Sequence, residues 1–147
     1  KLVEISPLTG LPMPNGRPAN PVFVVKIENT GGGAPQYGLN KADMVMEELV
    51  EGGLTRLAAF YYSRLPSKVG HVRSLRDTDI GIADPVGGQV VASGGAAGTY
   101  RRVERAGIVV EPVLAVKLTA AQRRAVEASA ADYAAFAGVP VSVAWPA

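Results

Sequence analysis

The chain has 147 residues with 48% hydrophobic and 19% charged side chains, a composition typical of one folded domain rather than a disordered chain. Its formal net charge of +2 is too small to indicate nucleic-acid binding, and the lack of cysteine excludes disulfides, thiol nucleophiles and thiolate metal sites. No apolar run reaches the ~18 residues of a membrane span. Because the chain begins at Lys1 rather than Met, we expect that a leader or an anchor upstream has been removed.

The first 20 residues hold four prolines and two glycines, which exclude a long helix or a central strand. We expect residues 1–20 to form an extended lead-in that packs three apolar side chains onto the domain: Leu8, Leu11 and Met13. The next run, 21–27, is apolar and β-branched between turn residues and predicts a buried strand. Residues 28–42 form a glycine-rich loop whose spacing matches neither GxGxxG nor the P-loop, so they indicate no nucleotide site.

Residues 43–63 predict a β-hairpin. Gly52 and Gly53 supply the positive φ angles that a two-residue turn requires, and apolar stretches flank them. A helix over 43–50 is the alternative, because this stretch contains good helix formers. We expect the nearby glutamates on the exposed side, with a carboxylate acid as the alternative role: Glu47, Glu48 and Glu51.

A helix is predicted over residues 74–82, with Ser74 or Asp77 as its N-cap. Residues 89–93 then predict a short buried strand. Residues 99–107 predict a short helix that ends on Gly107.

The last third of the sequence predicts further strands and one long helix. Residues 108–118 are apolar but interrupted by Pro112, so they predict two strand pieces or an edge strand. A capping box begins a helix over 119–138, and a final strand follows at 141–145. The whole pattern predicts a single α/β or mixed α+β domain over 21–147, with a mixed β-sheet packed against a few helices.

The stretch KVGHVRSLRDTDIG, residues 68–81, concentrates the charges most suited to a site. If a helix begins at Ser74, Arg73 and Arg76 lie at its N-terminal end, where free N–H groups favour anions. The two guanidinium groups then predict a phosphate or carboxylate clamp. Asp77 and Asp79 would orient the arginines or bind a hard cation. In the structural alternative, the aspartates cap the helix and pair with the arginines in a buried network.

Other residues complete this candidate binding site. Arg56, on the strand after the double glycine, is expected to reach the same cleft, and the Gly94–Gly95 turn is expected to form its other wall. His71 is a lone histidine without a second ligand, so we predict no zinc site there. A general base near neutral pH is the alternative role for it. We predict no catalytic residue, no metal and no cofactor. The arginines at 101, 102 and 105 are expected to form a solvated helix face.

Four stretches together resemble a bacterial family: SPLTGLP (6–12), VVKIENTGGGAPQYGLNKADMVMEELVEGGLTRLAAFYYS (24–63), VGHVRSLRDTDIG (69–81) and VASGG (91–95). They are similar to the N-terminal domain of the YerB-like lipoproteins, DUF3048, over residues 6 to about 107. The resemblance implies a lipid-anchored or secreted protein outside the bacterial plasma membrane, as part of a larger two-domain lipoprotein. The family usually has proline at the position of His71, and its loop after 99–107 and its C-terminal domain are not recognised here.

The sequence favours a non-enzymatic envelope domain that binds a partner protein or an anionic envelope ligand such as a glycopolymer, and no nucleic acid. One alternative is an enzyme acting on phosphorylated or polymeric cell-wall substrates, with Asp77 or Asp79 as base or metal ligand. The other is a purely structural scaffold.

Overall fold

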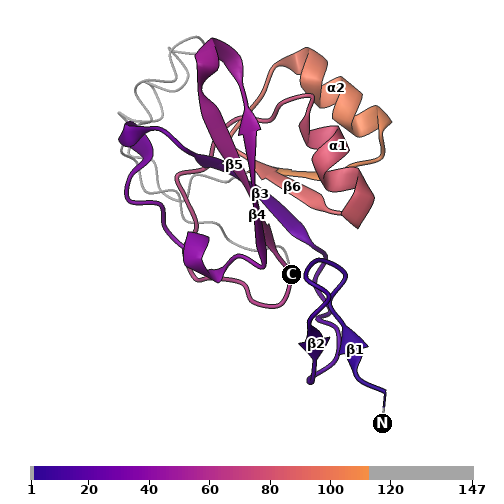
Figure 1. Cartoon of the computed structure of the whole chain (residues 1–147). Coiled ribbons are helices and arrows are strands. Elements are labelled where there is room, and N and C mark those ends of the chain that lie inside the picture. Colours follow the sequence, from indigo (N-terminus) through magenta and orange to yellow (C-terminus); the bar gives the residue numbers. More distant parts are fainter. Residues whose placement is uncertain (1, 113–147) are drawn as a thin grey trace, which may run out of the picture.

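The computed structural model describes residues 2–112, and a central five-stranded sheet organises them. A two-stranded hairpin precedes this sheet, and two helices cover part of it (Figure 1). In chain order the elements are β1 (Glu4–Ile5), β2 (Pro12–Met13), β3 (Phe23–Glu28), β4 (Met44–Leu49), β5 (Thr55–Tyr61), α1 (Asp79–Ala83), β6 (Gln89–Ala92), α2 (Ala97–Arg105) and β7 (Val110–Pro112).

The sheet is mixed, with the order β4-β5-β3-β6-β7. β3 pairs antiparallel with β5 and parallel with β6, while β7 lies parallel to β6 at one edge. The described residues therefore form one mixed α+β domain, as the sequence predicts. Within this part of the chain no helix is long and apolar enough to cross a membrane.

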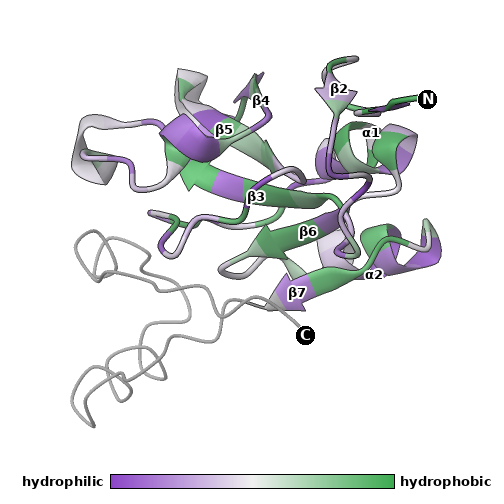
Figure 2. Cartoon of the chain, turned by 90° about the horizontal axis from the view of Figure 1, so that it is seen from below, coloured by the Kyte–Doolittle hydropathy of each residue, from purple (hydrophilic) through white to green (hydrophobic). Residues whose placement is uncertain are grey.

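The two faces of the sheet are covered differently. On one face, Val24, Phe60 and Val90 pack with residues from α1 and α2. On the other, Val25 and Tyr61 pack against side chains from the loops that follow β3 and β5. Figure 2 shows the resulting hydrophobic character of β3 and β6 at the centre of the sheet. We call these the helix face and the loop face.

Most of the predicted strands are confirmed. The hairpin forms as β4 and β5, so the alternative helix over 43–50 is wrong. Gly52 and Gly53 both have a φ of 71°, as predicted, but the connection is longer than a two-residue turn and contains a 3-10 turn over Glu51–Gly53. Gly107, with a φ of 75°, follows the end of α2.

The lead-in contains the β1–β2 hairpin rather than an entirely extended chain. Leu8 and Met13 pack against the core of the helix face as expected, but Leu11 is exposed and the expectation for it is wrong. Pro112 lies in the edge strand β7, in agreement with one of the two predictions for 108–118. The predicted helix over 119–138 and strand at 141–145 lie outside the described residues.

Candidate anion-binding pocket

The segment that carries the predicted arginines is extended, not helical. Arg73 N donates to Lys26 O at 2.8 Å, and Ser93 N donates to Arg73 O at 3.0 Å. Leu75 N donates to Gly94 O at 2.7 Å. Residues 71–75 are thus bonded between the end of β3 and the segment after β6, and these bonds hold them out of a helix.

The helix that follows begins later than the sequence predicts. α1 starts at Asp79 and has five residues, with Thr78 as the N-cap position. Neither Ser74 nor Asp77 is the N-cap, and Arg73 and Arg76 do not lie at the mouth of a regular helix. The predicted source of positive potential, a helix N-terminus beside these two arginines, is therefore wrong.

A pocket of about 460 Å³ nevertheless opens beside these arginines. It lies at the carboxyl ends of the parallel strands β3 and β6, the usual place for ligand binding in sheets with parallel strands. Its lining includes Arg56, Arg73, Ser74, Arg76, Gly95 and Thr99. We call it the arginine pocket.

The structure therefore brings most of the predicted binding residues together. Gly95 lines the wall as expected, whereas Gly94 does not and instead accepts the hydrogen bond from Leu75 N. Ser74 is buried and takes part through its backbone carbonyl. His71 is not among the lining residues and lies beside Tyr37, with their ring centroids 5.7 Å apart.

Glutamates, not the predicted aspartates, orient two of the arginines. Arg73 Nε pairs with the buried Glu28 carboxylate, and 19% of the Arg73 side chain stays exposed. Burial acts to raise the pKa of Glu28, but the Arg73 charge and hydrogen bonds from Thr30 and Arg73 hold it below its usual value. Arg76 Nε lies 2.7 Å from Glu51 Oε1, and 26% of the Arg76 side chain is exposed. Neither guanidinium is fully enclosed.

Arg56 adds a third cation to the pocket. One of its guanidinium nitrogens donates to Ser74 O at 3.0 Å, and no carboxylate of residues 2–112 forms an ion pair with it. Burial and the neighbouring charge of Arg76 lower the pKa of Arg56, although a guanidinium stays protonated near neutral pH. Three cations thus face two carboxylates around the pocket, an arrangement that favours a bound anion.

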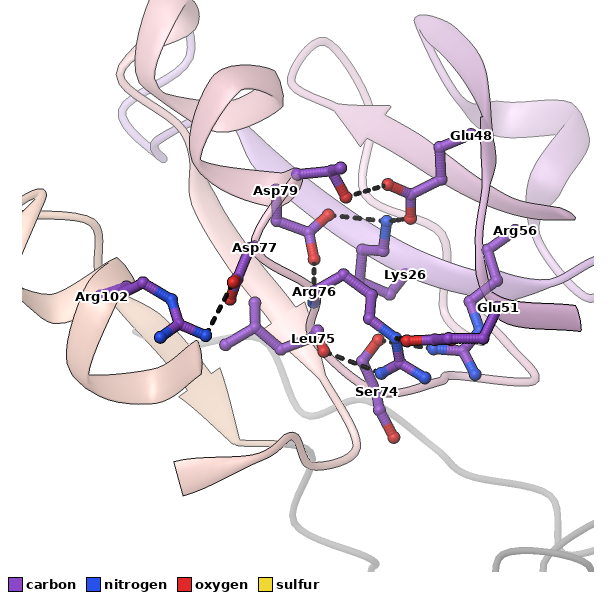
Figure 3. A network of polar contacts seen from close by, with 11 residues as sticks. Lys26, Glu48, Glu51, Arg56, Ser74, Leu75, Arg76, Asp77, Asp79 and Arg102 are labelled. Atoms are coloured by element: carbon purple, nitrogen blue, oxygen red, sulfur yellow. Dashed lines mark hydrogen bonds and ion pairs between the residues drawn. The ribbon is translucent and has the colours of Figure 1, made fainter. Parts of the chain in front are cut away.

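The two aspartates lie elsewhere, as Figure 3 shows. Asp79 is fully buried, with Oδ1 2.6 Å from Lys26 Nζ and Oδ2 accepting from Arg76 N at 2.7 Å. Lys26 also pairs with the buried Glu48, whose other oxygen accepts from the Thr78 hydroxyl at 2.8 Å. Asp79 therefore positions the backbone of Arg76 but not its guanidinium.

Asp77 belongs to a separate surface contact. It lies 2.7 Å from Arg102 on α2, and both side chains are more than half exposed. A hydrogen bond with Thr99, together with Arg102, lowers the pKa of Asp77. The expectation that Asp77 orients the pocket arginines is wrong. No group of three or more His, Cys, Asp or Glu side chains among residues 2–112 is placed to hold a metal ion.

Three charged residues of this network are not predicted correctly from the sequence. Lys26 and Glu28 lie within or next to the apolar run of β3, and Glu48 was expected on an exposed side but is buried. A signal was present: strand alternation puts Lys26 and Glu28 on the same face as Val24, so two charges continue an apolar face. In contrast, Glu47 is exposed as expected and accepts from Asn29.

Comparison with known proteins places the chain in a family. A family model described as "Protein of unknown function (DUF3048) N-terminal domain" matches residues 8–136. A Bacillus subtilis (strain 168) protein named "Putative lipoprotein YerB" is 34% identical over 99 residues, which are 67% of this chain and 30% of that protein. The crystal structure of YerB protein from Bacillus subtilis shares the fold, with a TM-score of 0.67 at 23% identity over 95% of this chain and 52% of that one. The chain thus spans less than a third of this curated relative, and it belongs to the DUF3048 N-terminal domain family.

Proposed function

We propose that this chain is a non-enzymatic domain of an extracytoplasmic envelope lipoprotein, and that the arginine pocket binds a carboxylate or phosphate group of a partner protein or envelope ligand. The name of the Bacillus subtilis relative supports the assignment to a lipoprotein. Membrane attachment through an N-terminal lipid anchor is part of this proposal.

The observation that carries the binding proposal is the presence of three guanidinium groups around one pocket of about 460 Å³. Arg56 lacks a carboxylate partner among residues 2–112, and the partner of Arg76, Glu51, is 72% exposed. A ligand anion can compete for Arg76 at little cost, because an exposed ion pair contributes little stability. Planar guanidinium groups match the geometry of carboxylate and phosphate oxygens.

The positions of the aspartates favour binding over the enzymatic alternative. Asp79 is buried against Lys26, and Asp77 pairs with Arg102 outside the arginine pocket. Neither carboxylate is placed to act as a base on a ligand held by Arg56, Arg73 and Arg76. The segment before α2 adds backbone to the wall through Gly95 and Ala96, and no side chain caps the helix there.

NMR titration with inorganic phosphate, read at the backbone amides of residues 73–76, tests this proposal. We expect the wild-type chain to bind phosphate, and Arg76→Ala to raise the Kd about tenfold, because Arg76 lines the pocket and its removal leaves only an exposed glutamate unpaired. Arg102→Ala is the matched control, since it removes another partly exposed arginine that pairs with a carboxylate outside the pocket. Equal phosphate affinity of wild type and Arg76→Ala would contradict the assignment of the pocket.

A further inference from the structure

A second pocket, of about 570 Å³, lies among the segments that cover the loop face of the sheet. Two segments form it: residues 38–41, from the loop after β3, and residues 64–68, which follow β5. Tyr61 at the end of β5 pairs with Phe23 at the start of β3, whereas Arg56 of the arginine pocket pairs with Glu28 at its end. The Tyr61 hydroxyl contacts Gly38 of the second pocket, so the two pockets lie toward opposite ends of β3.

The charged side chains that line this second pocket are all positive. Its lining includes the cations Lys41, Arg64 and Lys68 and contains no carboxylate. None of the three forms an ion pair with a carboxylate of residues 2–112. The arginine pocket, in contrast, includes Glu51 in its lining. We call the second pocket the lysine pocket.

The carboxylate of Asp43, two residues after Lys41, already accepts hydrogen bonds from the chain. Asp43 accepts hydrogen bonds from Tyr62 N at 2.7 Å, from Ser63 N at 3.0 Å and from the Ser63 hydroxyl. Its hydrogen-bonding capacity is thus directed to the end of β5 rather than to the lysine pocket. Its charge partly offsets the three cations, and a local excess of positive charge remains.

The walls of the lysine pocket are fixed by the fold. Tyr37 and Gly70 exchange two backbone hydrogen bonds, at 2.8 and 3.2 Å, and the Tyr61 hydroxyl donates to Gly38 O at 3.1 Å. Lys68 Nζ lies 3.4 Å from the centre of the Tyr37 ring, so a cation–π contact holds this side chain in place. The cations are thus presented by two segments that are held together before any ligand arrives.

We propose that the lysine pocket binds a phosphate-bearing ligand. Lysine ammonium groups act as point charges toward phosphate, and an arginine adds a planar fork, so three cations from two segments suit the several oxygens of a phosphate group. Ser67 and Asn40 at the lining supply additional polar groups. This inference does not rest on the proposed function of the arginine pocket, because no lining residue is shared.

NMR titration with inorganic phosphate separates the two pockets residue by residue. In the wild-type chain we expect the backbone amides of 38–41 and of the non-proline residues in 64–68 to shift in a saturable manner. In Arg64→Ala/Lys68→Ala the apparent Kd read from residues 38–41 should rise at least about tenfold, while shifts at 73–76 persist. Arg76→Ala is the reciprocal control and should leave the shifts at 38–41 unchanged.

The outcomes are distinct for the two sites. Absence of saturable shifts at 38–41 and 64–68 would overturn the lysine pocket, and so would an unchanged Kd at 38–41 in Arg64→Ala/Lys68→Ala. Absence of saturable shifts at 73–76 in the wild-type chain, with those at 38–41 and 64–68 present, would overturn only the arginine pocket. Sedimentation with vesicles distinguishes the possible sources of the phosphate. If the chain binds phosphatidylglycerol vesicles but not phosphatidylcholine vesicles, and Arg64→Ala/Lys68→Ala loses this binding, the ligand is a lipid headgroup. Phosphate binding without vesicle binding identifies a soluble or polymeric phosphate.

Discussion

At the scale of single residues, the buried group of Lys26, Glu48 and Asp79 links the core to the arginine pocket. Lys26 and Asp79 are fully buried, and burial lowers the pKa of Lys26 although Asp79 acts to raise it. The two carboxylates also accept from Thr78 and from the backbone of Arg76. The Lys26 ammonium group therefore compensates the charges of Glu48 and Asp79. These two carboxylates hold residues 76–78 before α1, which form one wall of the arginine pocket through Arg76.

Lys26→Met tests this compensation. The substitution leaves Glu48 and Asp79 buried without their shared cation, so we expect the free energy of unfolding to fall by about 3–5 kcal/mol in urea titrations. Arg102→Ala, which breaks an exposed pair, should cost no more than about 1 kcal/mol. A loss of similar size in the two variants would show that the buried group contributes little to stability.

At the scale of elements, local sequence predicted regular elements better than it predicted the segments between them. The double glycine and the apolar stretches beside it identify β4 and β5 correctly, although only β5 is buried: Val45, Met46 and Leu49 of the edge strand β4 are exposed. The segment 71–75 has helix-compatible residues, but its backbone bonds to Lys26 and Gly94 favour an extended form. These partners are distant in sequence, so no local pattern could reveal them.

The loop-face segments depend on a close backbone contact at Gly38. Its φ is +74°, and a Cβ there would overlap the carbonyl oxygen of Lys68. Gly52 has a similar φ of +71° with open space around it. We expect Gly52→Ala to cost about 1 kcal/mol from backbone strain alone, and Gly38→Ala to cost at least about 3 kcal/mol because overlap is added. Chemical denaturation measures both, and equal losses would contradict the close packing of the two segments.

At the scale of the whole molecule, the mixed α+β fold class and the family could be predicted from the sequence, whereas the order of the strands and the polar network could not. The mixed sheet follows from apolar strands separated by turns, and the resemblance to the YerB-like family agrees with the matching family model. The three arginines line one pocket, but Glu28 and Glu51, the partners of Arg73 and Arg76, lie 45 and 25 residues away in sequence. Contacts of the tertiary structure bring these residues together, and no spacing along the chain predicts them.

The same network sets how the stability of the whole domain responds to acid. The pKa of Glu28 is lower in the folded state than its usual value of 4.5, so the unfolded state binds more protons as the pH falls. The stability from Glu28 is therefore complete above about pH 4.5 and is lost as the pH falls through the folded pKa. The Glu51 pKa is also lowered, mainly by its hydrogen bond with Arg76, but Glu51 is largely exposed and solvent weakens its pair.

We therefore expect Glu28→Gln to be less stable than wild type at pH 7 and to lose less of its stability between pH 5 and about pH 3, because the group that takes up the proton is gone. Urea unfolding at a series of pH values measures both effects. Glu51→Gln serves as the control and should follow the wild-type curve closely. An acid limb of Glu28→Gln as steep as that of the wild type would mean that other carboxylates control acid unfolding, and that the Glu28–Arg73 pair does not couple the pocket to the stability of the domain.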